Sequence, residues 1–290
     1  MPAKTVMSGI AMRNFTRFPE IPDARALLDY GVWVEQLGFE SLWVWDHILL
    51  GTGILVLPLR NPLLLAKQVA TLDQLSGGRV ILGMASGWYK REFDAVGVPF
   101  EQRGKIMDKN LEIITRLWTE PSVTAEMPPY NMRSAVMFPK PASKPRPPIL
   151  IGGYVEAVLK RAGEKGDGWL TYFYKPDGFT AGWKKVCDYA KAAGKDPAKM
   201  QSSNQLPIMI GRSREEVKPK MMEWLSSEWD IASWSDSTPE SAIIGTVDDC
   251  LAQLQEHVKA GVDRIIFVPW RYDRAQIEII AREIVPKLGM

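Results

Sequence analysis

The chain is predicted to fold as an α/β barrel, in which eight parallel strands alternate with helices around a closed sheet. Short, nearly continuous apolar runs recur along the 290 residues and mostly alternate with segments of helical periodicity. Such runs are typical of parallel strands buried on both faces, and the length suits a (β/α)8 TIM barrel of about 250 residues. A doubly wound open sheet is the alternative, but the pattern G-x-G-x-x-G is absent after the first strand.

The strands are placed by their apolar runs and the helices by their end signals. The helix expected over 23–37 has an apolar stripe and stops at Gly38. Asn61 and Pro62 suit the N-cap and first position of the next helix, which stops at Gly77. The expected strands are 5–12, 41–45, 53–59, 80–84, 148–151, 168–173, 206–210 and 263–268. The other expected helices are 102–118, 155–165, 177–193, 214–225, 247–260 and 275–288.

Two segments do not follow the alternation. Residues 121–148 are rich in proline and lack periodicity, and residues 229–241 are polar. Both are expected to be loop excursions from one barrel domain that spans residues 1–290, and long excursions inside a compact domain are usually functional.

Composition excludes several classes of protein. Hydrophobic residues make up 46% of the chain and the net charge is only +2, so neither disorder nor nucleic-acid binding is indicated. No apolar run approaches the length of a membrane span, and residues 1–14 lack the apolar core of a secretory signal. Cys187 and Cys250 lack metal-ligand spacing. We expect a cytoplasmic protein with reduced thiols, no metal site, no membrane contact and no nucleic-acid partner.

The candidate site is placed by a general rule of barrels, whose active sites form at the C-terminal ends of the strands. The rule selects one imidazole, several glycines and several aromatic residues, but no paired carboxylates and no nucleophile triad. Sites with so little acid–base equipment often leave the chemistry to a cofactor. The selected positions include Asn14, Asp46, His47, Pro58, Ala85–Trp88, Gly152, Gly153, Phe173, Pro269 and Trp270.

Four blocks of sequence resemble the bacterial-luciferase-like oxidoreductases. They are GFESLWVWDH at 38–47, the stretch from GTGILVLPLRNP to VPFEQRG at 51–104, RPPILIGGYVEAVLKRAGEKGDGWL at 146–170 and GTVDDCLAQLQEHVKAGVDRIIF at 245–267. The blocks follow the family's order over nearly the whole chain. The resemblance implies a luciferase-like barrel and favours the branch that uses the deazaflavin F420. It leaves open an FMN-dependent flavoprotein monooxygenase.

His47 is the catalytic residue that the resemblance implies. In the F420-dependent relatives, the matching histidine sits against the reactive face of the ring and helps to protonate or deprotonate the substrate or the ring nitrogen. An imidazole suits this role because its pKa lies near neutrality. The alternative is a histidine that only satisfies its hydrogen bonds at a strand end.

The cofactor contacts are also carried over from the family. Asp46 precedes the catalytic histidine, and Gly53 and Ile54 match a position where relatives have a non-prolyl cis peptide behind the ring. The small residues Ala85, Ser86 and Gly87, with Trp88, line the cofactor in relatives, as do Gly152 and Gly153, which precede a helix start suited to a phosphate. By themselves, glycine pairs are more often turns and single aromatic residues more often packing.

The chain departs from the family between His47 and Gly51. Relatives have a whole helix there, and parallel neighbouring strands need a crossover of about a dozen residues. Three or four residues reach only about 10–14 Å. We therefore expect one of two outcomes. Either the expressed protein contains extra residues after His47, or the helix between strands 2 and 3 is lost and the exposed flank is covered by a partner subunit or a swapped element.

Three hypotheses for function remain from the sequence. The first is an enzyme, an F420-dependent oxidoreductase that transfers hydride to or from a small-molecule substrate, or an FMN-dependent monooxygenase that acts with O₂. The second is a non-catalytic flavin-binding protein with a truncated barrel, like the non-fluorescent flavoprotein of luminous bacteria. The third is a structural or interaction protein that has lost the site. The family further implies a homodimer.

Overall fold

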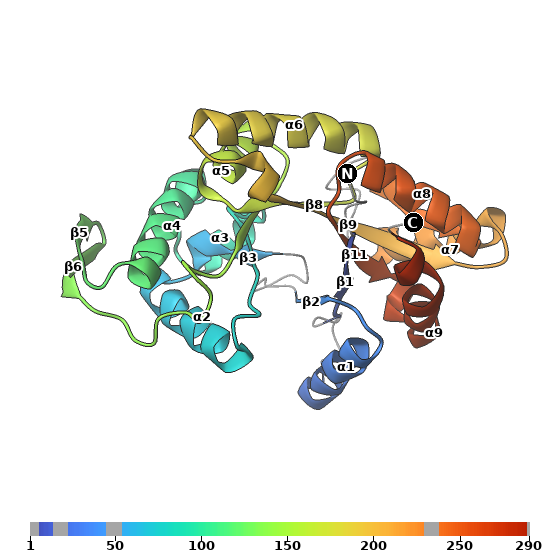
Figure 1. Cartoon of the computed structure of the whole chain (residues 1–290), viewed down its shortest axis with the longest axis horizontal. Coiled ribbons are helices and arrows are strands. Elements are labelled where there is room, and N and C mark those ends of the chain that lie inside the picture. The colour runs from blue at the N-terminus through green and yellow to red at the C-terminus, as the bar shows by residue number, and fades with distance from the viewer. Residues whose placement is uncertain (1–5, 14–22, 45–53, 229–237, 289–290) are drawn as a thin grey trace. The chain divides into compact units, whose positions relative to one another are not determined.

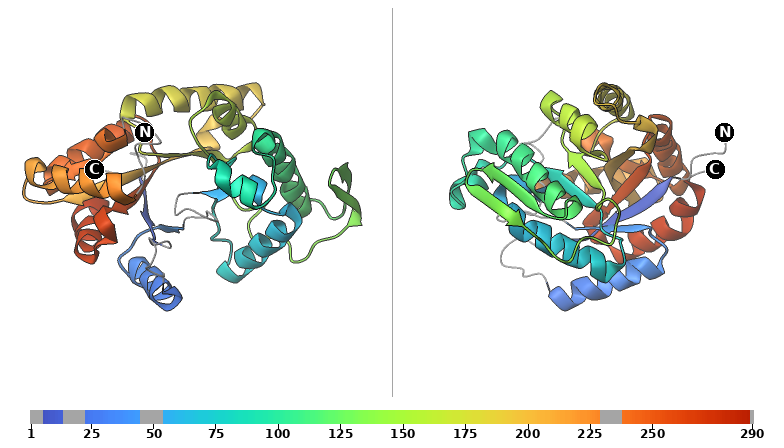
Figure 2. Two further views of the ribbon diagram at one scale, coloured as in Figure 1. Left: turned by 180° about the vertical axis from the view of Figure 1, so that it is seen from behind. Right: turned by 60° about the vertical axis from the view of Figure 1, so that its left-hand side comes forward.

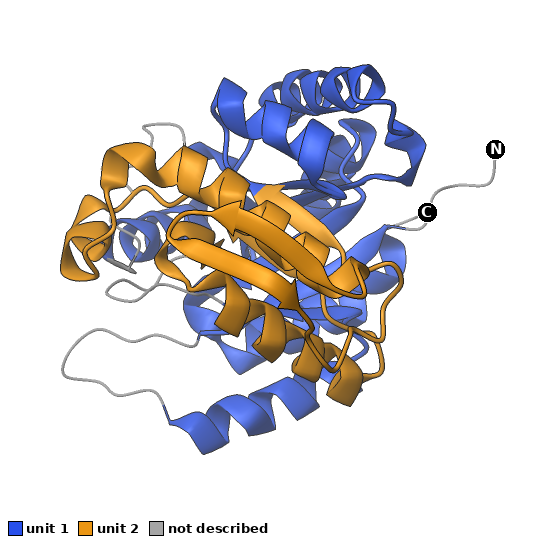
Figure 3. Ribbon diagram, turned by 90° about the vertical axis from the view of Figure 1, so that its left-hand side faces the viewer, with its two compact units in different colours: residues 1–45, 50–53, 152–290 blue, residues 46–49, 54–151 orange. Residues whose placement is uncertain are grey.

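The computed structural model of the chain describes residues 6–13, 23–44, 54–228 and 238–288. The chain divides into two compact units (Figure 3). Unit 1 comprises residues 1–45, 50–53 and 152–290, and unit 2 comprises residues 46–49 and 54–151. Each unit is described by itself.

Unit 1 contains a parallel sheet with helices packed against it (Figure 1). The strands lie in the order β2-β1-β11-β9-β8, and β10 also pairs with β9. The strands are β1 (Met7–Ala11), β2 (Ser41–Trp43), β8 (Gly168–Tyr172), β9 (Gln201–Ile210), β10 (Ile243–Gly245) and β11 (Arg264–Pro269). The helices are α1 (Ala24–Gln36), α5 (Glu156–Lys165), α6 (Pro176–Ala192), α7 (Arg214–Glu228), α8 (Val247–Lys259) and α9 (Arg274–Ile279). Shorter helical turns are η3 (Pro197–Lys199), η5 (Thr238–Ser241), η6 (Trp270–Tyr272), η7 (Ile280–Ile284) and η8 (Val285–Lys287).

Unit 2 contains three parallel strands in the order β3-β4-β7 and a separate antiparallel hairpin. The strands are β3 (Leu55–Val56), β4 (Leu82–Ala85), β5 (Val123–Met127), β6 (Tyr130–Ala135) and β7 (Ile149–Gly152), whose last residue falls in unit 1. The helices are α2 (Pro62–Ser76), α3 (Lys90–Ala95) and α4 (Arg103–Thr119), with short turns η1 (Leu57–Leu59) and η2 (Phe100–Gln102).

Glycines allow the helices of unit 1 to approach closely. A Cβ on Gly163 of α5 would lie 2.6 Å from the Val186 carbonyl of α6, so the close approach of α5 to α6 at this point requires a glycine. The ring of Trp169 in β8 stacks on the ring of Phe179 in α6, with centroids 5.1 Å apart. A Cβ on Gly182 would lie 2.4 Å from the Trp169 ring. The sheet is therefore covered by tightly packed helices, with the aromatic core beneath α6.

Three expectations about the elements need correction. The strand expected over 53–59 is only β3, and the 3-10 turn η1 follows, because Pro58 has no N–H for a strand ladder. The excursion 121–148 contains the β5–β6 hairpin, which lies beyond one end of α4 (Figure 2). The last helix is α9 for only six residues and then widens into a π-helical turn, η7.

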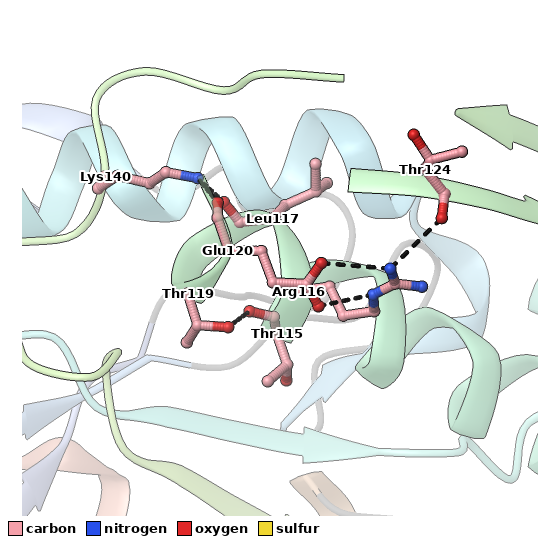
Figure 4. A network of polar contacts seen from close by, with 7 residues as sticks. All are labelled: Thr115, Arg116, Leu117, Thr119, Glu120, Thr124 and Lys140. Carbon is pink, nitrogen blue, oxygen red and sulfur yellow. Dashed lines mark hydrogen bonds and ion pairs between the residues drawn. The ribbon is translucent and has the colours of Figure 1, made fainter. Parts of the chain in front are cut away.

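Polar contacts fasten that excursion to α4 (Figure 4). Arg116 donates two hydrogen bonds to the Glu120 carboxylate, at 2.8 and 3.2 Å, and a third to the Thr124 carbonyl of β5 at 3.4 Å. The Lys140 ammonium donates to the carbonyls of Leu117 and Glu120, both at 2.6 Å. Lysine is well placed there, because the last carbonyls of a helix lack partners within the helix.

Candidate functional site

The C-terminal end of β4 carries four of the predicted cofactor residues. Ala85 pairs in register with Val56 of β3, and Ser86, Gly87 and Trp88 follow it on the way to α3. Ile54, another predicted contact, is buried directly before β3. In unit 2, Ala85–Trp88 therefore lie at the C-terminal end of β4, whereas Ile54 lies before the first residue of the parallel strand β3.

Gly87 holds a conformation and a space that exclude other residues. Its φ is +83°, and a Cβ there would lie 2.6 Å from Val56 Cγ1 and 2.8 Å from the Phe93 ring. Trp88 is 40% exposed and leans against Tyr89, with ring centroids 5.5 Å apart. Packing against Val56 and Phe93 thus requires a glycine at this position, and the neighbouring Trp88 presents an accessible aromatic face that suits a flat cofactor.

We expect Gly87→Ala to destabilise the protein more than Gly97→Ala does. Gly97 has a similar φ, +69°, but no atom lies within 4 Å of the added Cβ. Both substitutions carry the backbone strain, whereas only Gly87→Ala adds overpacking, which typically costs about 1–3 kcal/mol. Urea unfolding of both variants measures the difference. Equal losses of unfolding free energy would show that the Val56–Phe93 contact does not confine Gly87.

The C-terminal end of β7 provides the second group of predicted contacts. Gly153 has a φ of +126°. Its N–H donates to the Leu170 carbonyl at 3.3 Å, and its carbonyl accepts from the Trp169 indole at 2.8 Å. The helix α5 begins shortly after, and its N-cap Val155 gives no side-chain hydrogen bond to the first turn. A helix start of this kind can receive an anionic group, such as a phosphate.

Three tyrosines, Tyr154, Tyr172 and Tyr174, surround this second strand end. The Tyr154 hydroxyl donates to the Tyr172 carbonyl, and the Tyr154 ring stacks on Tyr174 with centroids 4.9 Å apart. Burial raises the pKa of Tyr154 and of Tyr172. Both phenols therefore stay protonated near neutral pH and can act as hydrogen-bond donors. Tyr154 directly follows the glycine pair, a signal that sequence analysis could have used.

Asn204, in the middle of β9, fixes this tyrosine segment and was missed by the sequence analysis. Its amide nitrogen donates to the Tyr174 carbonyl at 2.9 Å, and its oxygen accepts from the Thr171 hydroxyl at 2.9 Å. The same amide nitrogen lies 3.5 Å from Nδ1 of His257 on α8. Asn204 is completely buried, so these bonds are shielded from water.

The remaining predicted residues have varied outcomes. Asp46, His47 and Gly53 lie outside the described residues, as do the joint between strands 2 and 3 and the expected cis peptide at Gly53–Ile54. The indole N–H of Trp270 donates a hydrogen bond to the Lys220 carbonyl of α7 at 3.3 Å. The polar edge of this side chain is therefore bound to α7.

Comparison with known proteins identifies relatives along most of the chain. The model of the luciferase-like monooxygenase family matches residues 46–264. An F420-dependent glucose-6-phosphate dehydrogenase of Amycolatopsis mediterranei is 25% identical over 318 aligned residues, which cover 91% of this chain and 94% of that protein. An FMNH₂-dependent dimethylsulfone monooxygenase of Pseudomonas putida is 26% identical over 261 residues, 78% of this chain and 70% of that protein.

The solved structures include an F420-dependent secondary alcohol dehydrogenase in complex with an F420–acetone adduct. It superposes with a TM-score of 0.82 at 18% identity, covering 98% of this chain and 99% of that one. The alignment with the glucose-6-phosphate dehydrogenase is longer than the 290 residues of this chain, so that relative has segments without a counterpart here. The fold is the α/β barrel expected from the sequence, and the chain belongs to the luciferase-like monooxygenase family.

Proposed function

We propose that the protein is an oxidoreductase that uses the deazaflavin F420 for hydride transfer to or from a small organic substrate. The observation that carries the proposal is the left-handed glycine geometry at the matching strand ends, Gly87 after β4 and Gly153 after β7. F420-dependent relatives by sequence and by structure support it.

The described residues fit such a cofactor. A side chain at Gly87 would collide with Val56 and Phe93, so only glycine allows the loop after β4 to pack this closely. Gly152 and Gly153 precede the α5 start that suits a phosphate, and Trp88 offers an aromatic face. We infer that these residues hold the cofactor together with Asp46, Gly53, Ile54, Ala85 and Ser86.

The chain's own residues supply orientation and proton handling. When bound, the deazaflavin supplies the site that gives or accepts hydride. We infer that the His47 imidazole holds or moves the proton at the substrate or at the ring nitrogen, near neutral pH. Tyr154 and Tyr172, whose phenols stay protonated, keep the second strand end apolar and ordered through their mutual contact.

FMN is the second candidate cofactor. A monooxygenase that acts with O₂ is supported by the dimethylsulfone monooxygenase relative, which has nearly the same percentage identity as the F420-dependent one. FMN is the second choice because that alignment covers less of both chains than the alignment with the F420-dependent relative does.

We expect the purified protein to bind F420 more tightly than FMN. Titration followed by cofactor fluorescence measures both dissociation constants under one set of conditions. Micromolar FMN binding with no F420 binding would reverse the choice of cofactor. A turnover assay with reduced cofactor then separates the enzyme from a non-catalytic flavin-binding protein, which would bind without turnover.

We also propose that the protein is a cytoplasmic homodimer. Leu28 and Val32 lie one turn apart on α1 and are exposed, as is Leu42 of the neighbouring β2, an apolar surface suited to a second copy. Among the described residues, no helix has the length and apolar character needed to cross a bilayer. Sedimentation velocity tests the dimer: a monomer at micromolar concentration contradicts it, and Leu28→Lys should dissociate the assembly.

A further inference from the structure

A cavity of about 810 Å³ lies in unit 1, among three helices and the short strand β10. Its volume falls within the range of about 300–1,000 Å³ that small-molecule sites occupy. None of the predicted cofactor residues lines it. The lining residues come from the start of α6, from α7, η5, β10 and α8.

One face of α7 forms the charged wall of the cavity. Arg214, Lys218 and Met222 are spaced by four residues, so they lie along the same side of the helix. Of the two acids in the first turn of α7, Glu216 pairs with Arg212 and with Lys220, each at 3.2 Å, and Glu215 accepts hydrogen bonds from its own backbone and from Ser213. Arg214 and Lys218 make no ion pair with any described residue.

The acidic residues around the cavity are already balanced. Glu240 pairs with Lys175, and Glu256 pairs with Lys259 at 2.7 Å. Asp177 lies in the first turn of α6, where the helix terminus stabilises a carboxylate. Lys218 interacts electrostatically with Glu240, and Arg214 with Asp249, but neither cation forms an ion pair with a described residue, so both can bind an anion.

The floor of the cavity is apolar. Ala242 flanks the short strand β10 and Ile244 lies within it, and alternate residues of a strand share one face. Each is only 4% exposed, and Met222 of α7 is half-buried beside them. A ligand that fits this cavity must pair a negative charge with hydrocarbon.

We propose that this cavity binds a small amphipathic anion, with its head group on Arg214 and Lys218 and its alkyl chain on Met222, Ala242 and Ile244. The guanidinium can hold a carboxylate or phosphate through two parallel hydrogen bonds, and the ammonium adds a point charge. This site is separate from the cofactor contacts proposed above, and its occupancy can be measured without turnover.

Calorimetric titration of the whole protein with octanoate tests the proposal. We expect saturable binding with a dissociation constant below about 1 mM. Arg214→Gln and Lys218→Gln should each weaken it about ten-fold, because a hydrogen bond to a charged group is worth more than a neutral one. Met222→Glu, which adds a carboxylate beside the floor, should abolish it.

The chain offers a matched control in Arg212, an exposed arginine on the same segment that is paired with Glu216. Arg212→Gln should leave octanoate affinity unchanged. Octyl phosphate should bind at the same site, whereas octanol and inorganic phosphate, which each lack one half of the ligand, should bind far more weakly. The proposal is overturned by the absence of octanoate binding up to about 10 mM, or by equal affinity in the wild type, Arg214→Gln and Lys218→Gln proteins.

Discussion

Replacement of His47 by alanine is expected to lower kcat about 10²–10⁴-fold and to leave the dissociation constant of the cofactor unchanged. Loss of a positioned acid–base group typically costs this much in rate. The proposed role places His47 at the reacting atoms, whereas the glycines after β4 and β7 would hold the cofactor. His47→Ala should therefore change kcat without changing cofactor affinity. Steady-state turnover measures kcat, and cofactor fluorescence measures the affinity.

The other histidine provides the control for this experiment. The chain has only two histidines, and His257 lies buried on α8 against Asn204, outside the proposed catalytic contacts. His257→Asn should retain the wild-type kcat at pH 7. An unchanged kcat in His47→Ala would remove the catalytic role, while a parallel loss in both variants would point to a structural cause.

The parts of the fold that depend on local chemistry could be predicted from the sequence. Asn61 caps α2 by accepting hydrogen bonds from the N–H groups of Leu63 and Leu64, and Gly77 ends the helix with a φ of +67°. Both signals lie within a few residues of the structure they specify. The strand-end rule similarly located Gly87 and Gly153, whose left-handed backbone the structure contains.

The parts that depend on distant contacts could not be predicted in this way. The strand β10 is three residues long and is defined by its pairing with β9, more than 30 residues earlier. Asn204 acts on Tyr174, 30 residues away, so its neighbours in sequence give no hint of its role. The helix α3 begins directly after the Trp88–Tyr89 pair and spans only six residues, too few for a periodic pattern to be visible.

The buried pair of Asn204 and His257 also lowers the free energy of unfolding when the pH falls. His257 is 3% exposed, and burial lowers its pKa from the ordinary value of 6.5 to about 4. The Asn204 amide, 3.5 Å from Nδ1, can donate only if that nitrogen is unprotonated, which favours the neutral ring. The folded protein therefore keeps this imidazole neutral where the unfolded chain takes up a proton.

We expect the protein to lose stability as the pH falls from about 6.5 to about 4, and His257→Asn to remove much of that loss. Below pH 6.5 the unfolded state binds a proton that the folded state does not bind until pH 4, so acid favours unfolding. The lowered pKa corresponds to about 2 kcal/mol between pH 7 and pH 5, and to about 3 kcal/mol by pH 4. Asparagine retains an acceptor toward Asn204 but does not titrate. Urea unfolding of both proteins at pH 7 and pH 5 gives the two slopes, and carboxylates common to both cancel in the difference. Identical slopes would mean that His257 is protonated in the folded protein at pH 5.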